Sequence, residues 1–240
     1  MVSTEAPAFT GNRILDAVSQ TERERLVSRM RRRPITPRDT MYEPGDTMRE
    51  VYFPIVGVIS LMTPLLDDHP IETATIGNEG MVGVHAFLGG GPIGNARAVG
   101  QVPGSMLVLD ADTFRAEANG AGKLRSVMLT YTQALFAQIS QSVACNGAHE
   151  IQQRTAKWLL ETHDRAGGAD EFHLTQEYLS EMLGVRRPSV SVAAGTLQNA
   201  GLIEYRRGKI TVLDRPRLEQ ASCECYEAVR TEFSRLLGEG

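Results

Sequence analysis

Residues 174–213 read LTQEYLSEMLGVRRPSVSVAAGTLQNAGLIEYRRGKITVL, and this stretch decides the architecture of the C-terminal part of the chain. Thr175 is a typical N-cap residue for a helix over 176–183, and Gly184 supplies the left-handed conformation of a tight turn. Pro188 fits the first turn of a second helix, because its missing N–H would have no helical partner there. Gly201 ends this helix. Two short helices joined at a glycine form the helix-turn-helix pattern.

A β-hairpin is expected directly after the second helix. The stretches 202–205 and 209–213 flank a turn at Arg206-Arg207-Gly208, which adds a wing to the motif. Basic residues at the start of a second helix reach base edges, and basic residues on a wing meet phosphates, so the pattern predicts DNA binding. The candidate DNA-binding residues are Thr175, Gln176, Arg186, Arg187, Pro188, Ser189, Ser191, Val192, Arg206, Arg207 and Lys209.

The distribution of charge supports this interpretation, although a net charge of −4 by itself argues against a nucleic-acid partner. Residues 39–117 hold eleven acidic residues and three arginines, whereas residues 186–215 hold six basic and two acidic residues. Such segregation is typical of an acidic body with a basic end that faces a polyanion.

Residues 40–109 predict an antiparallel β domain. Short β-branched or alternating runs recur about every ten residues, separated by turns such as Glu43-Pro44-Gly45-Asp46 and with no helix between them. The expected strands are 51–53, 56–62, 71–76, 97–101 and 106–109. Pro54 and Pro64 are expected at strand ends or edges, because proline cannot donate to a β-ladder.

Helices are expected on both sides of the β domain. The residues before Pro34 predict one helix, with Thr21 and Glu24 at capping-box spacing. Asp110 is the predicted N-cap of a short helix through Glu117.

A longer helix is expected from Lys123 to Cys145, a stretch without glycine or proline, with a hinge at Gly147. Its apolar residues recur at heptad spacing, which is typical of a helix that pairs with a second copy. The residues assigned to the dimer interface are Leu124, Met128, Tyr131, Leu135, Ile139 and Ser142. A second apolar stripe (Phe136, Ile139, Val143) allows one face to meet the chain's own domain and the other a partner. A single wide core face fits the pattern equally well.

In this order of elements the chain resembles the cyclic-AMP receptor/Fnr (Crp-Fnr) superfamily of bacterial transcription regulators. Glu43-Pro44-Gly45-Asp46, Val51-Tyr52-Phe53, Leu174-Thr175-Gln176-Glu177 and Gly184-Val185-Arg186-Arg187 carry the resemblance. It implies an α+β fold: an N-terminal antiparallel β-roll like a cyclic-nucleotide-binding domain (a double-stranded β-helix), a long dimerisation helix and a C-terminal winged helix-turn-helix. The implied units are residues 1–119, 120–147 and 148–240. It also implies a homodimer on pseudo-palindromic promoter DNA and contact with RNA polymerase.

At the positions of the family's cyclic-nucleotide pocket, this chain departs from the family's residue pattern. The family uses a glutamate for the ribose and an arginine followed by serine or threonine for the cyclic phosphate. Gly83 is followed by Val84 at the glutamate position, Gly94-Asn95 replaces the Arg-Ser pair, and Ile139-Ser140 replaces the Thr-Ser pair that meets adenine. Because an unpaired buried phosphate is costly, we expect a degenerate pocket and assign no effector. The alternative is a cyclic-nucleotide-responsive regulator with a rearranged pocket in which Arg97 swings in.

Other features exclude further classes of protein. No stretch of about 20 apolar residues predicts a membrane span, and residues 1–10 lack a secretory pattern, so we expect a cytoplasmic protein. The sequence contains no residue spacing typical of a catalytic site, so we do not expect an enzyme. The glycines at 89–91 lack a following Gly-Lys-Ser/Thr and are interpreted as a loop rather than a nucleotide-binding P-loop. Cys223 and Cys225 have no adjacent histidine or second thiol pair, so we interpret them as plain thiols and expect no metal and no cofactor. The role of Cys145 is left open.

Overall fold

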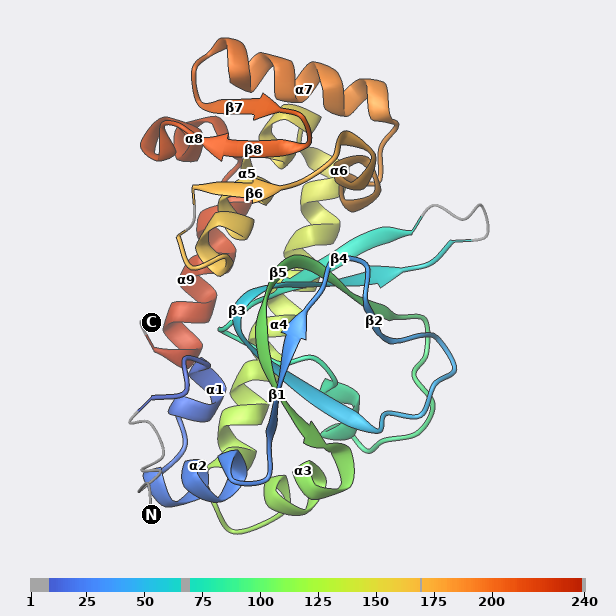
Figure 1. Ribbon diagram of the computed structural model, residues 1–240, viewed down its shortest axis with the longest axis vertical. Helices are drawn as coiled ribbons and strands as arrows, with labels where there is room; N and C mark the ends of the chain where they lie inside the picture. Colours follow the sequence, from blue (N-terminus) through green and yellow to red (C-terminus); the bar gives the residue numbers. More distant parts are fainter. Residues whose placement is uncertain (1–8, 66–69, 169, 239–240) are drawn as a thin grey trace.

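The computed structural model describes residues 9–65, 70–168 and 170–238 (Figure 1). A β-roll lies at the N-terminal end, the helix α4 runs along it, and a helix-rich head lies at the far end. In chain order the elements are α1 (Arg13–Asp16), α2 (Gln20–Val27), β1 (Arg31–Ile35), β2 (Thr40–Tyr42), β3 (Glu50–Thr63), β4 (Ile71–Ile76), η1 (Val84–Ala86), β5 (Arg97–Asp110), α3 (Ala111–Ala118), α4 (Leu124–Ala148), α5 (Ile151–Arg165), β6 (Glu171–His173), α6 (Gln176–Leu183), α7 (Arg187–Asn199), β7 (Ile203–Arg206), β8 (Lys209–Val212), α8 (Arg215–Ala221) and α9 (Cys225–Leu237).

The β-roll consists of antiparallel strands in the order β1-β5-β3-β4, with β2 also paired to β5. The predicted strands merge: 51–53 and 56–62 lie within β3, and 97–101 and 106–109 lie within β5. Pro54 lies inside β3, opposite Met106, rather than at an end or edge. The ladder tolerates it because the β3–β5 register shifts between Pro54 and Val56, as at a β-bulge.

Two glycines make the central crossing of β3 and β5 feasible. A Cβ at Gly104 would lie 1.8 Å from the carbonyl oxygen of Val56, and a Cβ at Gly57 would lie 2.8 Å from that of Val102. Gly57 also has a φ of +100°. Any side chain at Gly104 would therefore separate the two longest strands of the roll.

The N-terminal residues differ from the single helix that we predicted before Pro34. They form α1, α2 and the strand β1, which pairs with β5 from Arg31 to Ile35. The capping box uses Ser19 and Glu22, not Thr21 and Glu24. The register of the cap differs by two residues because Glu22 is also held by the backbone N–H of Leu124, a tertiary contact.

Most of the buried hydrophobic residues described belong to two large cores. The first joins the roll to α1, α3 and α4, and includes Phe53, Phe114 and Tyr131. The second joins α5, α6, α7 and the wing, and includes Leu159 and Leu197. Met62 and Val99 of the roll belong to the second core, so the roll and the head are packed against each other.

The C-terminal helix α9 returns from the head to the roll (Figure 1). Its Val229 and Phe233 are buried in the first core, although residues 148–240 were predicted as one unit. The Arg13 guanidinium of α1 hydrogen-bonds the carbonyl oxygen of Gly238 just after α9. The helix therefore connects the two ends of the molecule. No helix among the described residues is long and apolar enough to cross a membrane.

Candidate DNA interface and its connection to the roll

The helix-turn-helix forms where the sequence predicts it. The Thr175 side chain accepts a 3.1 Å hydrogen bond from the backbone N–H of Tyr178 and caps α6. Gly184 follows α6 with a φ of +61°, the left-handed conformation expected for the turn. Pro188 lies in the first turn of α7, and Gly201 follows its end with a φ of +71°. Local sequence signals therefore set both helices.

One face of α7 is turned outward and its opposite face is buried. Arg186, Arg187, Pro188 and Ser189 are exposed, and Val192 is 70% exposed. The buried face consists of Val190, Ala193, Ala194 and Leu197. The outward face combines guanidinium donors with one apolar contact, which are the groups that read guanine edges and thymine methyls in a major groove.

Two of the candidate DNA-binding residues, Ser191 and Gln176, are hydrogen-bonded to each other. The Ser191 hydroxyl donates a 2.8 Å hydrogen bond to Oε1 of Gln176, which connects α7 to the first turn of α6. Both side chains are half-buried. This hydrogen bond joins the two helices in addition to their packing in the second core.

The three wing cations differ in whether they are paired with a carboxylate. Arg206 pairs with Glu204 at 2.9 Å, and Lys209 pairs with Glu171 at 2.6 Å. The Lys209 ammonium lowers the pKa of Glu171 by hydrogen bonding and charge. Arg207 lies at the wing turn with a φ of +50° and forms no ion pair within the part of the chain that is described. Of the three wing cations, Arg207 is therefore the most available to a phosphate.

The dimer face that we assigned to α4 is largely a core face. Leu124, Met128, Tyr131 and Leu135 are buried in the chain's own first core, and the Tyr131 hydroxyl donates a 2.7 Å hydrogen bond to the carbonyl oxygen of Met81. These four side chains pack on the roll of the same chain. The prediction erred because heptad spacing is the same for a contact within one chain and for a contact between two chains. Ile139 and Ser142 are partly buried.

A different stripe of α4 is unpartnered in the single chain. Leu129, Phe136 and Val143 follow one another at intervals of seven residues and are 54%, 72% and 68% exposed. We call these three residues the outer stripe. Large apolar side chains at heptad spacing on an exposed helix are typical of a coiled-coil contact.

Buried side chains of the chain itself pack in the core of the roll. Tyr42, Met81 and Ile93 belong to this core, and His85 packs edge-on against Tyr42 with ring centroids 5.8 Å apart. Arg97 does not point inward: its Nε donates a 2.6 Å hydrogen bond to Glu43, and both side chains are partly exposed. Within the described residues, the positions of Val84 and Gly94 supply no charged group for a ribose or a phosphate.

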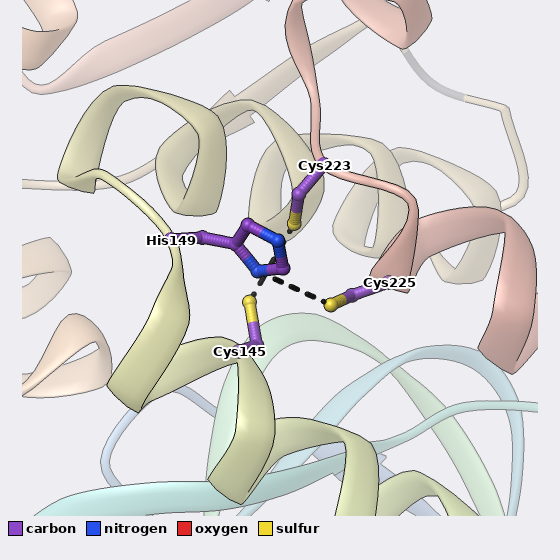
Figure 2. Close-up of side chains that lie close together, drawn as sticks. All are labelled: Cys145, His149, Cys223 and Cys225. Carbon is purple, nitrogen blue, oxygen red and sulfur yellow. Dashed lines mark hydrogen bonds between the residues drawn. The ribbon is translucent and has the colours of Figure 1, made fainter.

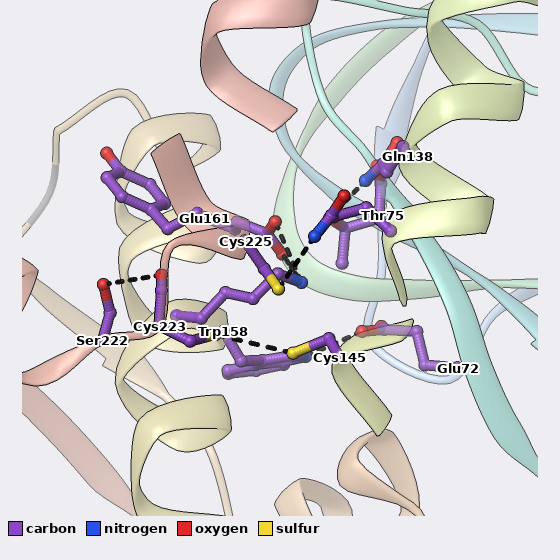
Figure 3. Close-up of polar contacts among 12 residues, drawn as sticks. Glu72, Thr75, Gln138, Cys145, Trp158, Glu161, Ser222, Cys223 and Cys225 are labelled. Carbon is purple, nitrogen blue, oxygen red and sulfur yellow. Dashed lines mark hydrogen bonds and ion pairs between the residues drawn. The ribbon is translucent and has the colours of Figure 1, made fainter. Parts of the chain in front are cut away.

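Polar contacts connect the roll to the head (Figure 3). The Trp158 indole of α5 donates a 2.8 Å hydrogen bond to Glu72 of β4. The Tyr178 hydroxyl of α6 donates a 3.2 Å hydrogen bond to the carbonyl oxygen of Gly100 in β5. The roll therefore contacts both α5 and α6, the helix that precedes the exposed helix α7.

Sequence reasoning missed one cluster. Cys145, His149, Cys223 and Cys225 lie together at the junction of α4 with the segment that joins α8 to α9 (Figure 2). The Cys145 thiol hydrogen-bonds Cys223 and lowers the pKa of Cys223 to about 6. No histidine or second thiol pair is adjacent to Cys223 and Cys225 in the sequence, but the fold brings Cys145 and His149 to them from 78 and 76 residues away. The sequence shows the Cys-x₃-His spacing of Cys145 and His149 and the Cys-x-Cys spacing of Cys223 and Cys225, but not that the two pairs meet.

Comparison with known proteins identifies the head and the fold. Residues 153–221 match the model of the Crp-like helix-turn-helix domain. FixK2 from Bradyrhizobium japonicum superposes with a TM-score of 0.66 at 18% identity, covering 81% of this chain and 98% of FixK2. A CRP/FNR-family transcriptional regulator from Thermus thermophilus gives 0.65 at 18% identity, covering 80% of this chain and 98% of that one.

A third similar structure is the c-di-GMP responsive global regulator CLP from Xanthomonas campestris, with a TM-score of 0.63 at 14% identity over 81% of this chain and 99% of that one. No curated protein sequence gives a significant match. The shared fold confirms the predicted β-roll, long helix and winged helix-turn-helix. Residues 153–221 are therefore a Crp-like helix-turn-helix domain, and the fold of the chain is similar to that of CRP/FNR-family transcriptional regulators.

Proposed function

We propose that the chain is a homodimeric regulator that reads pseudo-palindromic promoter DNA through α7. The observation that carries this proposal is the exposed N-terminal turn of α7, with Arg186 and Arg187 directed away from the buried face of the helix. A helix of this kind enters the major groove by its N-terminal residues. The planar fork of Arg187 can engage O6 and N7 of guanine together, which discriminates bases by about 1–3 kcal/mol.

The remaining candidate DNA-binding residues divide into two roles. Pro188 and Val192 stand where members of the family carry base-reading residues, and neither can hydrogen-bond a base edge. The base preference should therefore differ from that of the cyclic-AMP receptor, with Val192 (70% exposed) against a thymine methyl. Thr175, Ser189 and the wing cations are assigned to phosphates.

The outer stripe of α4 supports the dimer. Two copies that pair through Leu129, Phe136 and Val143 would bury three apolar side chains each and leave the core face of α4 on its own roll. Such a dimer presents two reading heads, whose half-sites lie one helical turn (~34 Å) apart on DNA. We assign residues 1–119 to the roll, 120–147 to the dimer helix and 148–240 to the head with its returning helix α9.

The roll is proposed to have lost cyclic-nucleotide binding. The positions of the nucleotide-binding glutamate and arginine are taken by Val84 and Gly94, and Arg97 is engaged with Glu43 at the surface. Because the head is packed on the roll through Tyr178 and Trp158, another effector or a protein contact at the roll can still change the head. RNA polymerase is the partner expected for a promoter-bound member of this family.

Selection of bound sequences from a random pool of duplex DNA tests the proposal. We expect an enriched pseudo-palindrome whose half-sites are one helical turn apart, protected on both half-sites in a footprint. Enrichment of a single half-site, or a chain that remains monomeric at micromolar concentration, would overturn it. Calorimetry with cyclic AMP and cyclic GMP distinguishes a degenerate pocket, which gives no heat, from a rearranged one.

A further inference from the structure

Four side chains that can bind a metal converge where the dimer helix meets the C-terminal helix (Figure 2). Cys145 lies in the last turn of α4 and His149 directly after it, whereas Cys223 and Cys225 flank the start of α9. One nitrogen or sulfur atom from each of the four lies within 4.8 Å of all the others. We infer that Cys145, His149, Cys223 and Cys225 form a zinc site, which we call the Cys₃His site.

The donor set fits zinc in number, type and spacing. Three thiolate sulfurs and one imidazole nitrogen form one of the sets that structural zinc sites use, with tetrahedral geometry. Zn–S bonds of about 2.3 Å imply sulfur–sulfur edges of about 3.8 Å in a tetrahedron. Here Sγ of Cys145 lies 3.5 Å from Sγ of Cys223, and Sγ of Cys225 lies 3.4 Å from Nδ1 of His149. Small side-chain movements would therefore suffice to close the site around an ion.

The surroundings of His149 argue for a ligand rather than for thiols that merely fill a core. Its Nδ1 faces Cys225, and its Nε2 lies 3.1 Å from Oε1 of Glu224. A carboxylate on the outer nitrogen holds the proton there and leaves the inner nitrogen free to coordinate, as in carboxylate–histidine–zinc arrangements. Glu224 stands between the two C-terminal cysteines, so the same short segment supplies two ligands and this outer partner.

Further contacts are suited to sulfur ligands that carry negative charge. The Gln141 amide donates a 3.0 Å hydrogen bond to Sγ of Cys225. Arg154 and Lys157 of α5 line the same small cavity as Cys145, and Lys157 is also paired with Glu161 at 3.1 Å. Three thiolates around one Zn²⁺ leave a net charge of about −1, which these groups offset.

The site is closed and positioned to join separate parts of the fold. The three cysteines are buried, with at most 3% of any of them exposed, and all four ligand positions come from the protein. A closed four-ligand site is structural rather than catalytic. An ion there would tie the end of α4, where the chain turns into the head, to α9, which packs back on the roll.

Metal analysis of the full-length protein tests the inference without using DNA, so its failure is distinguishable from failure of the proposed function. The protein is purified under reducing conditions, passed over a desalting column and analysed for zinc by mass spectrometry. We expect one zinc per chain, and the visible absorption of tetrahedral thiolate-ligated Co²⁺ when cobalt replaces it. The Co²⁺ spectrum of the wild-type protein is informative even where a variant fails to fold.

Variants then identify the ligands. Cys225→Ser and His149→Ala should lose zinc, whereas His173→Ala, an exposed histidine on β6, should keep one equivalent. Glu224→Gln should keep the stoichiometry but weaken zinc affinity roughly 10–100-fold in a chelator competition. The inference is overturned if the reduced wild type retains no zinc and shows only octahedral Co²⁺, or if His149→Ala and His173→Ala hold zinc equally well. A Cys145–Cys223 disulfide in air-purified protein whose reduced form takes up no zinc would overturn it in favour of a redox pair.

Discussion

Nε1 of Trp158 in α5 donates a 2.8 Å hydrogen bond to Oε1 of Glu72 in β4, so a buried carboxyl group of the roll is held by the first helix of the head (Figure 3). The other carboxyl oxygen lies 2.6 Å from the Ser60 hydroxyl, which is also 2.6 Å from Oε1 of Gln101. One hydroxyl proton cannot serve two acceptors. Both contacts can be hydrogen bonds if Glu72 is protonated: its carboxyl O–H then donates to the Ser60 hydroxyl oxygen, and the Ser60 O–H donates to Oε1 of Gln101.

This arrangement predicts a pH dependence of stability. Burial raises the pKa of Glu72 from its ordinary value of 4.5 to about 8, with Glu161 adding to the rise and Ser60, Trp158 and Lys157 opposing it. Between these values the folded chain binds the proton and the unfolded chain does not. The free energy of unfolding should therefore fall as the pH rises through this window, with a slope of up to about 1.4 kcal/mol per pH unit from this group.

Urea unfolding at pH 5, 6, 7 and 8 measures this slope. Glu72→Gln keeps an acceptor for Trp158 and a donor for Ser60 but cannot ionise, so the variant should lose this contribution. Glu177→Gln, an exposed carboxylate on α6, is the control and should follow the wild type. Equal slopes for Glu72→Gln and the wild type would show that Glu72 ionises normally in the folded chain.

The outer stripe predicts which residues of α4 hold the dimer. Phe136→Glu should convert the protein to a monomer and reduce DNA affinity at least tenfold, because it places a charge at the centre of the proposed apolar contact. Phe136 is 72% exposed in the single chain, so the free energy of unfolding of the monomer should change little. Ser126→Glu, exposed on α4 outside the stripe, should remain dimeric. Sedimentation velocity measures both, and a dimeric Phe136→Glu would assign the contact to another surface.

Base reading and phosphate contact should separate in the reading head. Arg187→Ala should flatten the preference at one base pair per half-site and leave the salt dependence of binding nearly intact, because a base contact releases few counterions. Binding titrations on the selected site and on single-base variants, at several salt concentrations, measure both effects. Equal loss of affinity for every sequence would mean that α7 lies in the groove in another orientation.

Arg207→Ala is the matched variant for phosphate. It should weaken all sequences alike and reduce the slope of log K against log salt by about one. Lys209→Ala should reduce the slope less, because the ammonium is already paired with Glu171 at 2.6 Å. A larger effect for Lys209 than for Arg207 would contradict this assignment.

Cyclic AMP at up to millimolar concentration should change neither the melting temperature nor DNA affinity. Val84 and Gly94 provide no charged groups for its ribose and phosphate, and the Arg97 side chain is paired with Glu43 at 2.6 Å. Binding at 100 times the dissociation constant would stabilise the fold by about 2.7 kcal/mol, which thermal unfolding detects readily. A reproducible rise in melting temperature would establish a rearranged pocket.

Much of the fold was determined by local signals in the sequence. Thr175, Gly184 and Pro188 act on their own and neighbouring backbone, so the cap, the turn and the start of α7 follow from residue type alone. Asp110 likewise caps α3 as predicted, through a 2.8 Å hydrogen bond from the N–H of Thr113. The short β-branched and alternating runs of residues 40–109 predicted the antiparallel roll. The order of the motifs along the chain predicted the resemblance to the Crp-Fnr superfamily.

Contacts between distant segments were decided only by the tertiary structure. Helical periodicity showed two apolar stripes on α4 but not which one meets the roll, because an intrachain and an interchain seam have the same spacing; Tyr131 proved to be buried and Phe136 exposed. Cys145 and Cys223 are 78 residues apart, and their 3.5 Å contact depends on α9 folding back along α4. No local pattern records that return, so a Cys-x₃-His and a Cys-x-Cys pair that look unrelated in the sequence form one site in the folded chain.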